Sequence, residues 1–277
     1  MTKALDRSAV TTTPARYAKV IVPIGDTIDP MVARIAGQLA DRIGASVEVL
    51  AVVSPGLEEL DAMQLRAEIG ELRRPMGLHL VTDDGDVPGA LLAEAAARRG
   101  LICLGTRGAT AFGEALFGSV AGEVIRRSRR ELVVVGPHCT RELRGDTLVI
   151  AIDGSEGARA IVPAAVDLAG MLDLRPRLVE VLPAGNSSPT ERRVELARLA
   201  DVARIAELAR PNDEQILVHG SRVDETLVAM SGQSRVAMLA MATHGQSRFE
   251  RLVGGSVTLD VVRRAQCPVL VGPRSTG

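Results

Sequence analysis

Two glycine-rich segments of this chain have the composition and spacing of an anion-binding loop. The first consists of Gly105, Gly108, Gly118 and Ser119, and nine residues separate Gly108 from Gly118. It directly follows the apolar run Leu101–Leu104. A glycine-rich loop that leaves a buried strand and enters a helix exposes backbone N–H groups, and these can hold a phosphate. The expected chemistry is the binding of a nucleotide by main-chain amides.

The second segment repeats this pattern with one substitution. Ala242, Gly245, Gly255 and Ser256 each lie 137 residues after their counterparts, and they follow the apolar run Met238–Met241. Because the interval is the same at every position, we infer a duplicated module. Each copy then has one potential nucleotide pocket.

The composition limits the classes of function. The 277 residues are 46% hydrophobic, which is enough to bury the cores of two ordinary domains. Aromatic residues make up 1% and the net charge is −1, so neither a base-stacking platform nor a polyanion-binding surface is indicated. The arginines at 126, 127, 129 and 130 are interpreted as solvated residues at the end of a helix, where cations suit the dipole. We expect no nucleic-acid partner.

The cysteines, histidines and N-terminus are typical of an intracellular protein without a metal site. Cys103, Cys139 and Cys267 have no metal-type spacing, and we expect buried free thiols in a reducing cytoplasm. The four histidines are scattered, so no metal site is predicted. Residues 1–16 lack the apolar stretch of a signal peptide and are expected to form a disordered leader. No apolar run approaches the roughly 20 residues that cross a bilayer, so no membrane partner is expected.

The elements that position the loops follow from the apolar pattern. In the first half, strands are predicted at 19–24, 46–53, 77–81, 101–104 and 132–135, with helices at 29–44, 57–74, around 91–95 and 120–127. In the second half, strands are predicted at 147–152, 177–182, 215–218, 236–241 and 269–271, with helices up to 170 and at 190–210, 225–230 and 257–264. Short, almost continuous apolar strands that alternate with helices are typical of a parallel sheet covered on both faces.

The predicted fold class is therefore α/β, with two tandem doubly wound domains of Rossmann-like topology and five parallel strands each. The chain divides into a leader at 1–16, a first domain at 17–140, a linker at 141–146 and a second domain at 147–277. The final strands, 132–135 and 269–271, are expected to pack against each other and form an internal pseudo-dimer. In such sheets ligands bind beyond the carboxyl ends of the strands, where the winding reverses. The turns after the first and fourth strands of each half lie there.

The spacing Gly-x2-Gly-x9-Gly-Ser resembles the nucleotide-binding signature of the universal stress protein family. The segments GTRGATAFGEALFGSV and ATHGQSRFERLVGGSV both resemble that family's loop, as do the segments at 152–155 and 267–272. The resemblance covers about 17–273 as a tandem pair, and it implies an adenine nucleotide alpha hydrolase-like fold that binds ATP. Because no lysine accompanies the loops, Mg²⁺ is expected to offset the charge of the triphosphate.

The resemblance also implies the residues of each site, with an aliphatic residue of the second strand bordering adenine. The first site would comprise Pro23, Ile24, Gly25, Val52, Gly105, Arg107, Gly108, Gly118, Ser119 and Val120. The second would comprise Ala151, Ile152, Asp153, Val181, Ala242, Gly245, Gly255, Ser256 and Val257. Each site departs from the family pattern once, since Gly25 replaces an aspartate and Ala242 replaces a glycine. We expect the first site to hold the phosphates, because its glycine set is intact.

No catalytic residues are predicted, because no Ser/His/Asp or Cys/His set is placed beside the loops. The predicted function is an ATP-binding sensor or regulator in a stress response. A nucleotide-free dimerisation or interaction module of the same fold is one alternative, and a slow ATPase is another. A homodimer and an unidentified protein partner are further expectations of the resemblance.

Overall fold

The computed structural model describes residues 16–24, 27–53, 55–56, 58–72, 74–83, 85–106, 119–183, 189–205, 215–220, 222–242 and 257–272. The first half contains β1 (Lys19–Ile24), α1 (Pro30–Ile43), β2 (Ser46–Val53), α2 (Glu58–Glu71), β3 (Gly77–Thr82), α3 (Val87–Ala97), β4 (Gly100–Gly105), α4 (Ser119–Arg127) and β5 (Leu132–Val135). The second half contains β6 (Thr147–Ala151), α5 (Glu156–Met171), β7 (Arg175–Pro183), α6 (Pro189–Ile205), β8 (Gln215–Gly220), α7 (Val223–Ser231), β9 (Val236–Ala242), α8 (Val257–Arg264) and β10 (Val269–Gly272).

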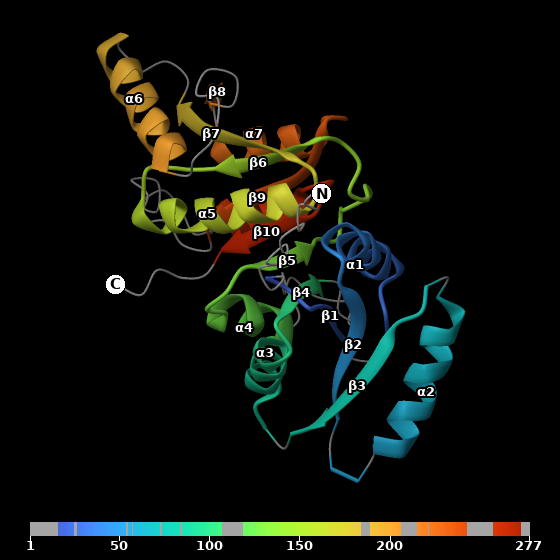
Figure 1. The fold of residues 1–277 in the computed structure, drawn as a ribbon. Coiled ribbons are helices and arrows are strands. Elements are labelled where there is room, and N and C mark those ends of the chain that lie inside the picture. Colours follow the sequence, from blue (N-terminus) through green and yellow to red (C-terminus); the bar gives the residue numbers. More distant parts are fainter. Residues whose placement is uncertain are drawn as a thin grey trace, which may run out of the picture.

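The strands of both halves form one sheet with the order β3-β2-β1-β4-β5-β10-β9-β6-β7-β8. This order is two copies of a five-stranded doubly wound sheet joined through their last strands, which confirms the predicted fold class (Figure 1). Neighbouring strands within each half are parallel, whereas β5 and β10 are antiparallel, with Val269 opposite Val134 and Val271 opposite Leu132. The predicted pairing of the last strands is therefore confirmed.

Helices cover both faces of the sheet, as the apolar strands require. On β2, Val47 and Val49 pack on the face of α1, and Leu50 joins the cluster of α3 and α4 on the other face. The cluster on the first face contains Leu39 of α1 and Leu168 of α5, so a single core crosses the β5–β10 seam. None of the described helices has an apolar stretch long enough to cross a bilayer.

The predicted start and end of α1 are confirmed by its caps. The carboxylate of Asp29 accepts a hydrogen bond from the Met31 amide at 2.7 Å, and Pro30 occupies the first turn. Gly44 ends the helix with φ of 69°, a left-handed conformation that glycine adopts at little cost. These caps set where β1 ends and α1 begins, and the candidate site lies at that junction.

The connection between β5 and β6 is hydrogen-bonded to both halves. Arg42 of α1 donates to the carbonyl oxygens of Leu143 at 2.8 Å and Leu172 at 3.2 Å. Arg141, in the connection itself, donates to the carbonyl oxygen of Ser234 at 3.0 Å. The linker thus holds the two halves in a defined relation.

The three cysteines are buried thiols that form no disulfide, as predicted. Burial raises the pKa of the Cys267 thiol to about 12, and burial also raises the pKa of Cys103. Both therefore remain protonated thiols at neutral pH, in keeping with a packing role.

A polar cluster joins the two halves at the amino end of the sheet. Arg16 donates to Glu131 at 2.8 Å and to Asp167 of α5 at 2.5 Å, and the Tyr17 hydroxyl also donates to Glu131. Arg16 belongs to the predicted leader, and the rest of that leader lies outside the described residues. Glu131 is buried, so its carboxylate depends for its hydrogen bonds on these donors and on its own backbone amide.

Glu131 is expected to make the protein less stable in acid. Burial disfavours its carboxylate, but the bonds from Tyr17 and Arg16 outweigh burial, and the pKa of Glu131 lies below its ordinary 4.5. Because this pKa is lower in the folded chain, the stabilisation is complete above 4.5 and is lost as the pH falls through the folded pKa. We expect Glu131→Gln to flatten the acid dependence of the free energy of unfolding, measured in urea at a series of pH values.

The exposed Glu123, which pairs with Arg126 on the surface of α4, provides the control for this experiment. Glu123→Gln should leave the acid dependence unchanged, because surface pairs contribute little. Equal acid slopes for Glu131→Gln and the unmodified chain would contradict the role assigned to the cluster.

Candidate functional site

A pocket of about 240 Å³ lies at the carboxyl ends of β1 and β4, under the starts of α3 and α4. It is lined by Val22, Pro23, Ile24, Thr27, Asp29, Val32, Val52, Val87, Leu91, Leu104, Gly105, Thr106, Val120 and Ala121. Five residues of the first predicted site therefore surround one cavity: Pro23, Ile24, Val52, Gly105 and Val120. They come from four separate elements or their ends, and the fold brings them together where the winding of the sheet reverses.

The walls of this pocket are mainly aliphatic, and two of its polar side chains, those of Asp29 and Thr106, are already engaged. The Asp29 carboxylate caps α1, and the Thr106 hydroxyl donates to the Val135 carbonyl oxygen at 3.3 Å. A ligand with a flat apolar body fits such walls. Its polar edge would have to meet main-chain groups.

Glycine is required at position 105 by packing as well as by the proposed loop. A Cβ at Gly105 would lie 2.8 Å from Cγ2 of Val32, which lines the same pocket. Real Cβ atoms essentially never approach that closely, so a larger residue would push α1 away from β4. The sequence pattern attributed this glycine to the ligand alone, and the structure adds the contact with Val32.

The positive end of α4 lies at the mouth of the pocket. Ser119 is the first residue of this helix, and Val120, 37% exposed, lines the cavity beside it. The first amides of a helix have no partner within the helix, and the dipole favours negative charge there. Of the other residues predicted for this site, Gly25, Arg107, Gly108 and Gly118 lie outside the described residues, as does the side chain of Ser119.

The second predicted site is built on the equivalent elements. The Asp153 carboxylate accepts a hydrogen bond from the Ser155 amide at 2.9 Å and so shapes the turn into α5. Ala151, Val181 and Val257 pack against one apolar cluster, whereas the side chain of Ile152 is buried on the opposite face. Gly245, Gly255 and Ser256 lie outside the described residues.

A hydrogen bond that the sequence analysis missed sits at the entrance to this second site. The Thr258 hydroxyl donates to the Ala242 carbonyl oxygen at 2.7 Å, and both residues are buried. Their counterparts 137 residues earlier are Ala121 and Gly105, which line the first pocket. The second site thus contains more side-chain atoms than the first, and a hydrogen bond joins α8 directly to β9. Comparison of the two copies at this interval could have found Thr258.

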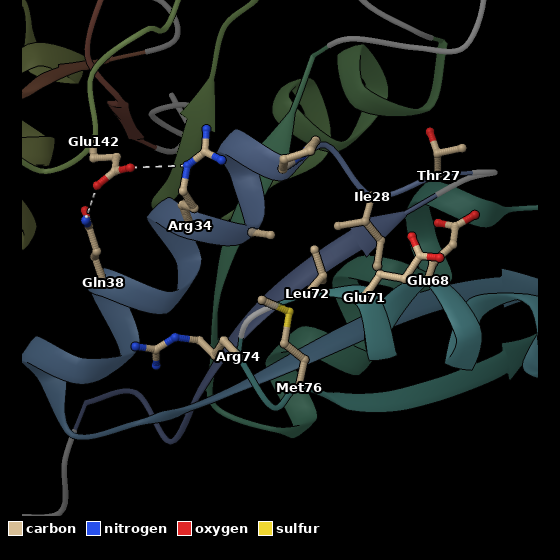
Figure 2. Close-up of a pocket in the computed structure, with 12 residues that line it drawn as sticks. Thr27, Ile28, Arg34, Gln38, Glu68, Glu71, Leu72, Arg74, Met76 and Glu142 are labelled. Carbon is tan, nitrogen blue, oxygen red and sulfur yellow. Dashed lines mark hydrogen bonds and ion pairs between the residues drawn. The ribbon is translucent and has the colours of Figure 1, made fainter.

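A larger groove of about 810 Å³ lies between α1 and α2, and no sequence pattern singled it out. Figure 2 shows Glu142 of the linker at one end, where its carboxylate accepts from Arg34 at 3.2 Å and from Gln38 at 2.7 Å. Glu68 and Glu71, one helical turn apart on α2, line the other end. A phosphate in this groove would meet three carboxylates, and the two arginines that also line it, Arg34 and Arg74, are already paired with Glu142 and Asp41. Electrostatics therefore favours the smaller pocket for an anionic ligand.

No group of three or more histidine, cysteine or acidic residues that could hold a metal ion occurs within the described part of the chain. The acidic loop before α3 has another use. Asp83 accepts from the amides of Gly85 and Asp86 at 2.7 Å each, and Asp86 caps α3 through the Gly89 amide at 3.2 Å. These carboxylates therefore shape the turn and start the helix.

Comparison with known proteins places the chain in one family. The family model for the universal stress protein family matches residues 77–136 and 146–273. The universal stress protein Slr1230 of Synechocystis sp. is 29% identical over 172 residues, which cover 61% of this chain and 56% of that protein. The chain thus spans little more than half the length of this curated relative.

Two solved structures share the whole fold. A universal stress protein from Archaeoglobus fulgidus DSM 4304 is 15% identical with a TM-score of 0.63, and the match covers 94% of this chain and 99% of that one. The functionally unknown protein PA1789 from Pseudomonas aeruginosa PAO1 is also 15% identical with a TM-score of 0.63, over 93% of this chain and 92% of that one.

Proposed function

Since this chain belongs to the universal stress protein family, we propose that its first half binds ATP with Mg²⁺ in the pocket between β1 and β4. On this proposal it acts in the cytoplasm as a nucleotide-dependent sensor or regulator of a stress response. The observation that carries the proposal is that Pro23, Ile24, Val52, Gly105 and Val120 line one cavity. The resemblance to the family implies all five residues for the first site, and they are spread over almost 100 positions of the chain.

The aliphatic walls suit a purine. Val52 lies on β2, and Leu91 of α3 lines the same cavity, so the base would be enclosed by aliphatic side chains from a strand and a helix. The ends of β1 and β4 would offer main-chain groups to the base and ribose. Burial of a flat ring between aliphatic side chains is a favourable contribution that needs no aromatic partner.

The phosphates would extend toward the start of α4. There the unpaired amides and the helix dipole favour an anion, and Mg²⁺ would neutralise much of the remaining charge. Among the described lining residues the carboxylate is that of Asp29, which is engaged in capping α1. With no base poised in this part of the pocket, we propose that the nucleotide is held rather than rapidly hydrolysed.

The phosphate position is tested by placing a negative charge at Val120. We expect Val120→Asp to weaken binding of magnesium ATP by about tenfold or more, because two like charges a few ångströms apart near a protein surface repel by ~1–4 kcal/mol. An acidic residue in the first turn stabilises a helix, so the melting temperature should not fall. Isothermal titration calorimetry and thermal unfolding measure the two effects.

Val120→Asn is the matched control, because it has the same size as the aspartate but no charge. Its affinity should remain close to that of the unmodified chain. If Val120→Asp bound ATP as well as Val120→Asn does, the triphosphate would not lie at the start of α4.

For the second half we propose that the pocket takes no nucleotide and that this half serves in pairing with the first. The bond from Thr258 to Ala242 favours this assignment, since it joins the two elements between which the phosphates would enter. We expect one ATP per chain in calorimetry. The double variant Ala242→Gly, Thr258→Ala reproduces Gly105 and Ala121 of the first half, and we expect it to raise the stoichiometry to two.

A stoichiometry of two in the unmodified chain would overturn the assignment of the second half. A stoichiometry of one that persists in the double variant would show that Ala242 and Thr258 are not what closes the second site. Val120→Asp in the background of the double variant identifies which site is filled.

A further inference from the structure

A second hollow in the first half lies at the amino end of the sheet, away from the ATP pocket. Its volume is about 680 Å³, and it lies between α3 and the turn that joins α4 to β5. Leu92, Ala93 and Ala96 of α3 form its apolar side together with Ile102 of β4. We call it the α3–α4 groove. The alanines leave it open because their side chains do not reach across.

Three arginines line the other side of this groove: Arg127, Arg129 and Arg130. Arg127 donates to the Asp86 carboxylate at 2.7 Å, and this bond holds the pKa of Asp86 at about 2. The Arg130 guanidinium lies 5.8 Å from the centre of the Tyr17 ring, in a cation–π contact, and it forms no ion pair with a residue in the described part of the chain.

Arg129 has no hydrogen bond or ion pair with any residue in the described part of the chain. The nearby Glu131 also lines the groove, but its carboxylate is engaged by Arg16 and the Tyr17 hydroxyl. The groove therefore combines an apolar wall with two guanidinium groups that form no ion pair with a carboxylate among the described residues.

The second half shows which of these arginines the fold itself requires. Arg264, which lies 137 residues after Arg127, pairs with Asp224 at the start of α7, as Arg127 pairs with Asp86 at the start of α3. This ion pair is common to both copies and is structural. At the positions of Arg129 and Arg130, by contrast, the second half has Gln266 and Cys267.

In the second half, the connection between β5 and β6 contacts Gln266, the counterpart of Arg129. The carbonyl oxygen of Gln266 accepts from the amides of Thr140 at 3.2 Å and Arg141 at 3.0 Å. The second half thus forms the same fold without arginines at the positions that correspond to 129 and 130. Arg129 is therefore an addition to the first half that no described contact explains, and Arg130 is an addition whose described contact is with the Tyr17 ring.

We propose that the α3–α4 groove binds a small amphiphilic anion. Its acidic head, a carboxylate or a phosphate monoester, would lie at Arg129 and Arg130, and its short apolar chain would lie along Leu92, Ala96 and Ile102. A guanidinium offers two parallel N–H donors that match the two oxygens of a carboxylate. The chain would cover apolar surface that water now contacts. This site is separate from the proposed ATP pocket.

Sodium octanoate is the probe, titrated into the full chain by calorimetry, with 1-octanol as an uncharged ligand of the same chain length. We expect octanoate to bind with a submillimolar dissociation constant and octanol to bind at least about tenfold more weakly. Arg129→Gln introduces the residue of the second half and should weaken octanoate about tenfold. Arg126→Gln is the matched control, because Arg126 pairs with Glu123 and does not line the groove.

Ala96→Leu tests the apolar side without changing any charge. Its side chain would occupy the apolar side of the groove, where the chain of octanoate is proposed to lie, so octanoate binding should be lost while binding of magnesium ATP is unchanged. The proposal is overturned if octanoate fails to bind at millimolar concentration, if octanol binds equally well, or if Arg129→Gln and Ala96→Leu both retain the original affinity. Because octanoate binding is measured separately from ATP binding, failure of the nucleotide proposal would not change the interpretation of the octanoate experiment.

Discussion

Val52→Phe is expected to reduce the affinity of the first half for magnesium ATP by about 100-fold. Val52 lies on β2 and lines the cavity of about 240 Å³, and the resemblance places it beside adenine. A phenyl ring at this position would occupy the volume proposed for the base. Forcing additional atoms into a filled site costs ~1–3 kcal/mol, which corresponds to the expected loss. Calorimetry with magnesium ATP measures it directly.

Val81→Phe is the control for this substitution. Val81 on β3 packs on the same apolar cluster as Val52, but it does not line the pocket. Val81→Phe should therefore bind ATP like the unmodified chain. Equal affinity in Val52→Phe, with a normal thermal transition, would refute the placement of the base beside β2.

Gly136→Ala is expected to lower the free energy of unfolding by about 3 kcal/mol or more. Gly136 follows β5, and a Cβ there would lie 1.9 Å from the carbonyl oxygen of Val262 in α8. Val262 is buried in the core, so this main-chain atom can move only if α8 moves. The substitution would separate the two halves at the seam where β5 meets β10. Urea unfolding monitored by circular dichroism measures the loss.

Gly170→Ala provides the matched control, because it makes the same chemical change without a steric clash. Gly170 lies in α5, and a Cβ there would meet no heavy atom within 4 Å. Alanine is favoured over glycine in a helix by up to ~1 kcal/mol, so this variant should be slightly more stable than the unmodified chain. If the two variants were equally stable, the contact between Gly136 and α8 would not contribute to the seam.

Most of the secondary structure could be predicted because each element carries a local signal. The strands predicted at 19–24, 46–53 and 132–135 have the observed bounds, since each is a mainly apolar run, rich in valine or isoleucine, between turn residues. β7 is longer than predicted, since it begins at Arg175 rather than at 177 and pairs with β6 from its first residue. The apolar pattern does not extend over polar residues at the end of a strand. Whether such residues belong to the strand is therefore decided by their pairing with the neighbouring strand.

The candidate site could be predicted where its sequence pattern occurs in both halves of the chain. A constant interval of 137 residues exposed the duplicated loops, and the resemblance then selected five residues that the fold brings around one pocket. The glycines at 108, 118, 245 and 255 lie outside the described residues, so their role stays a prediction. The contact of Gly105 with Val32 could not be foreseen, because it depends on how closely α1 packs on β4.

By itself, the amino-acid sequence determined that the protein is a tandem α/β repeat and which strands it contains, because apolar periodicity and turn residues act over a few positions. Tertiary structure alone decided that Thr258 bonds to Ala242, that the linker is tied to both halves, and that Arg129 lines an apolar groove without an ion-pair partner among the described residues. These contacts join residues whose distance depends on the packing of helices against the sheet. The spacing of residues along a chain does not specify that packing.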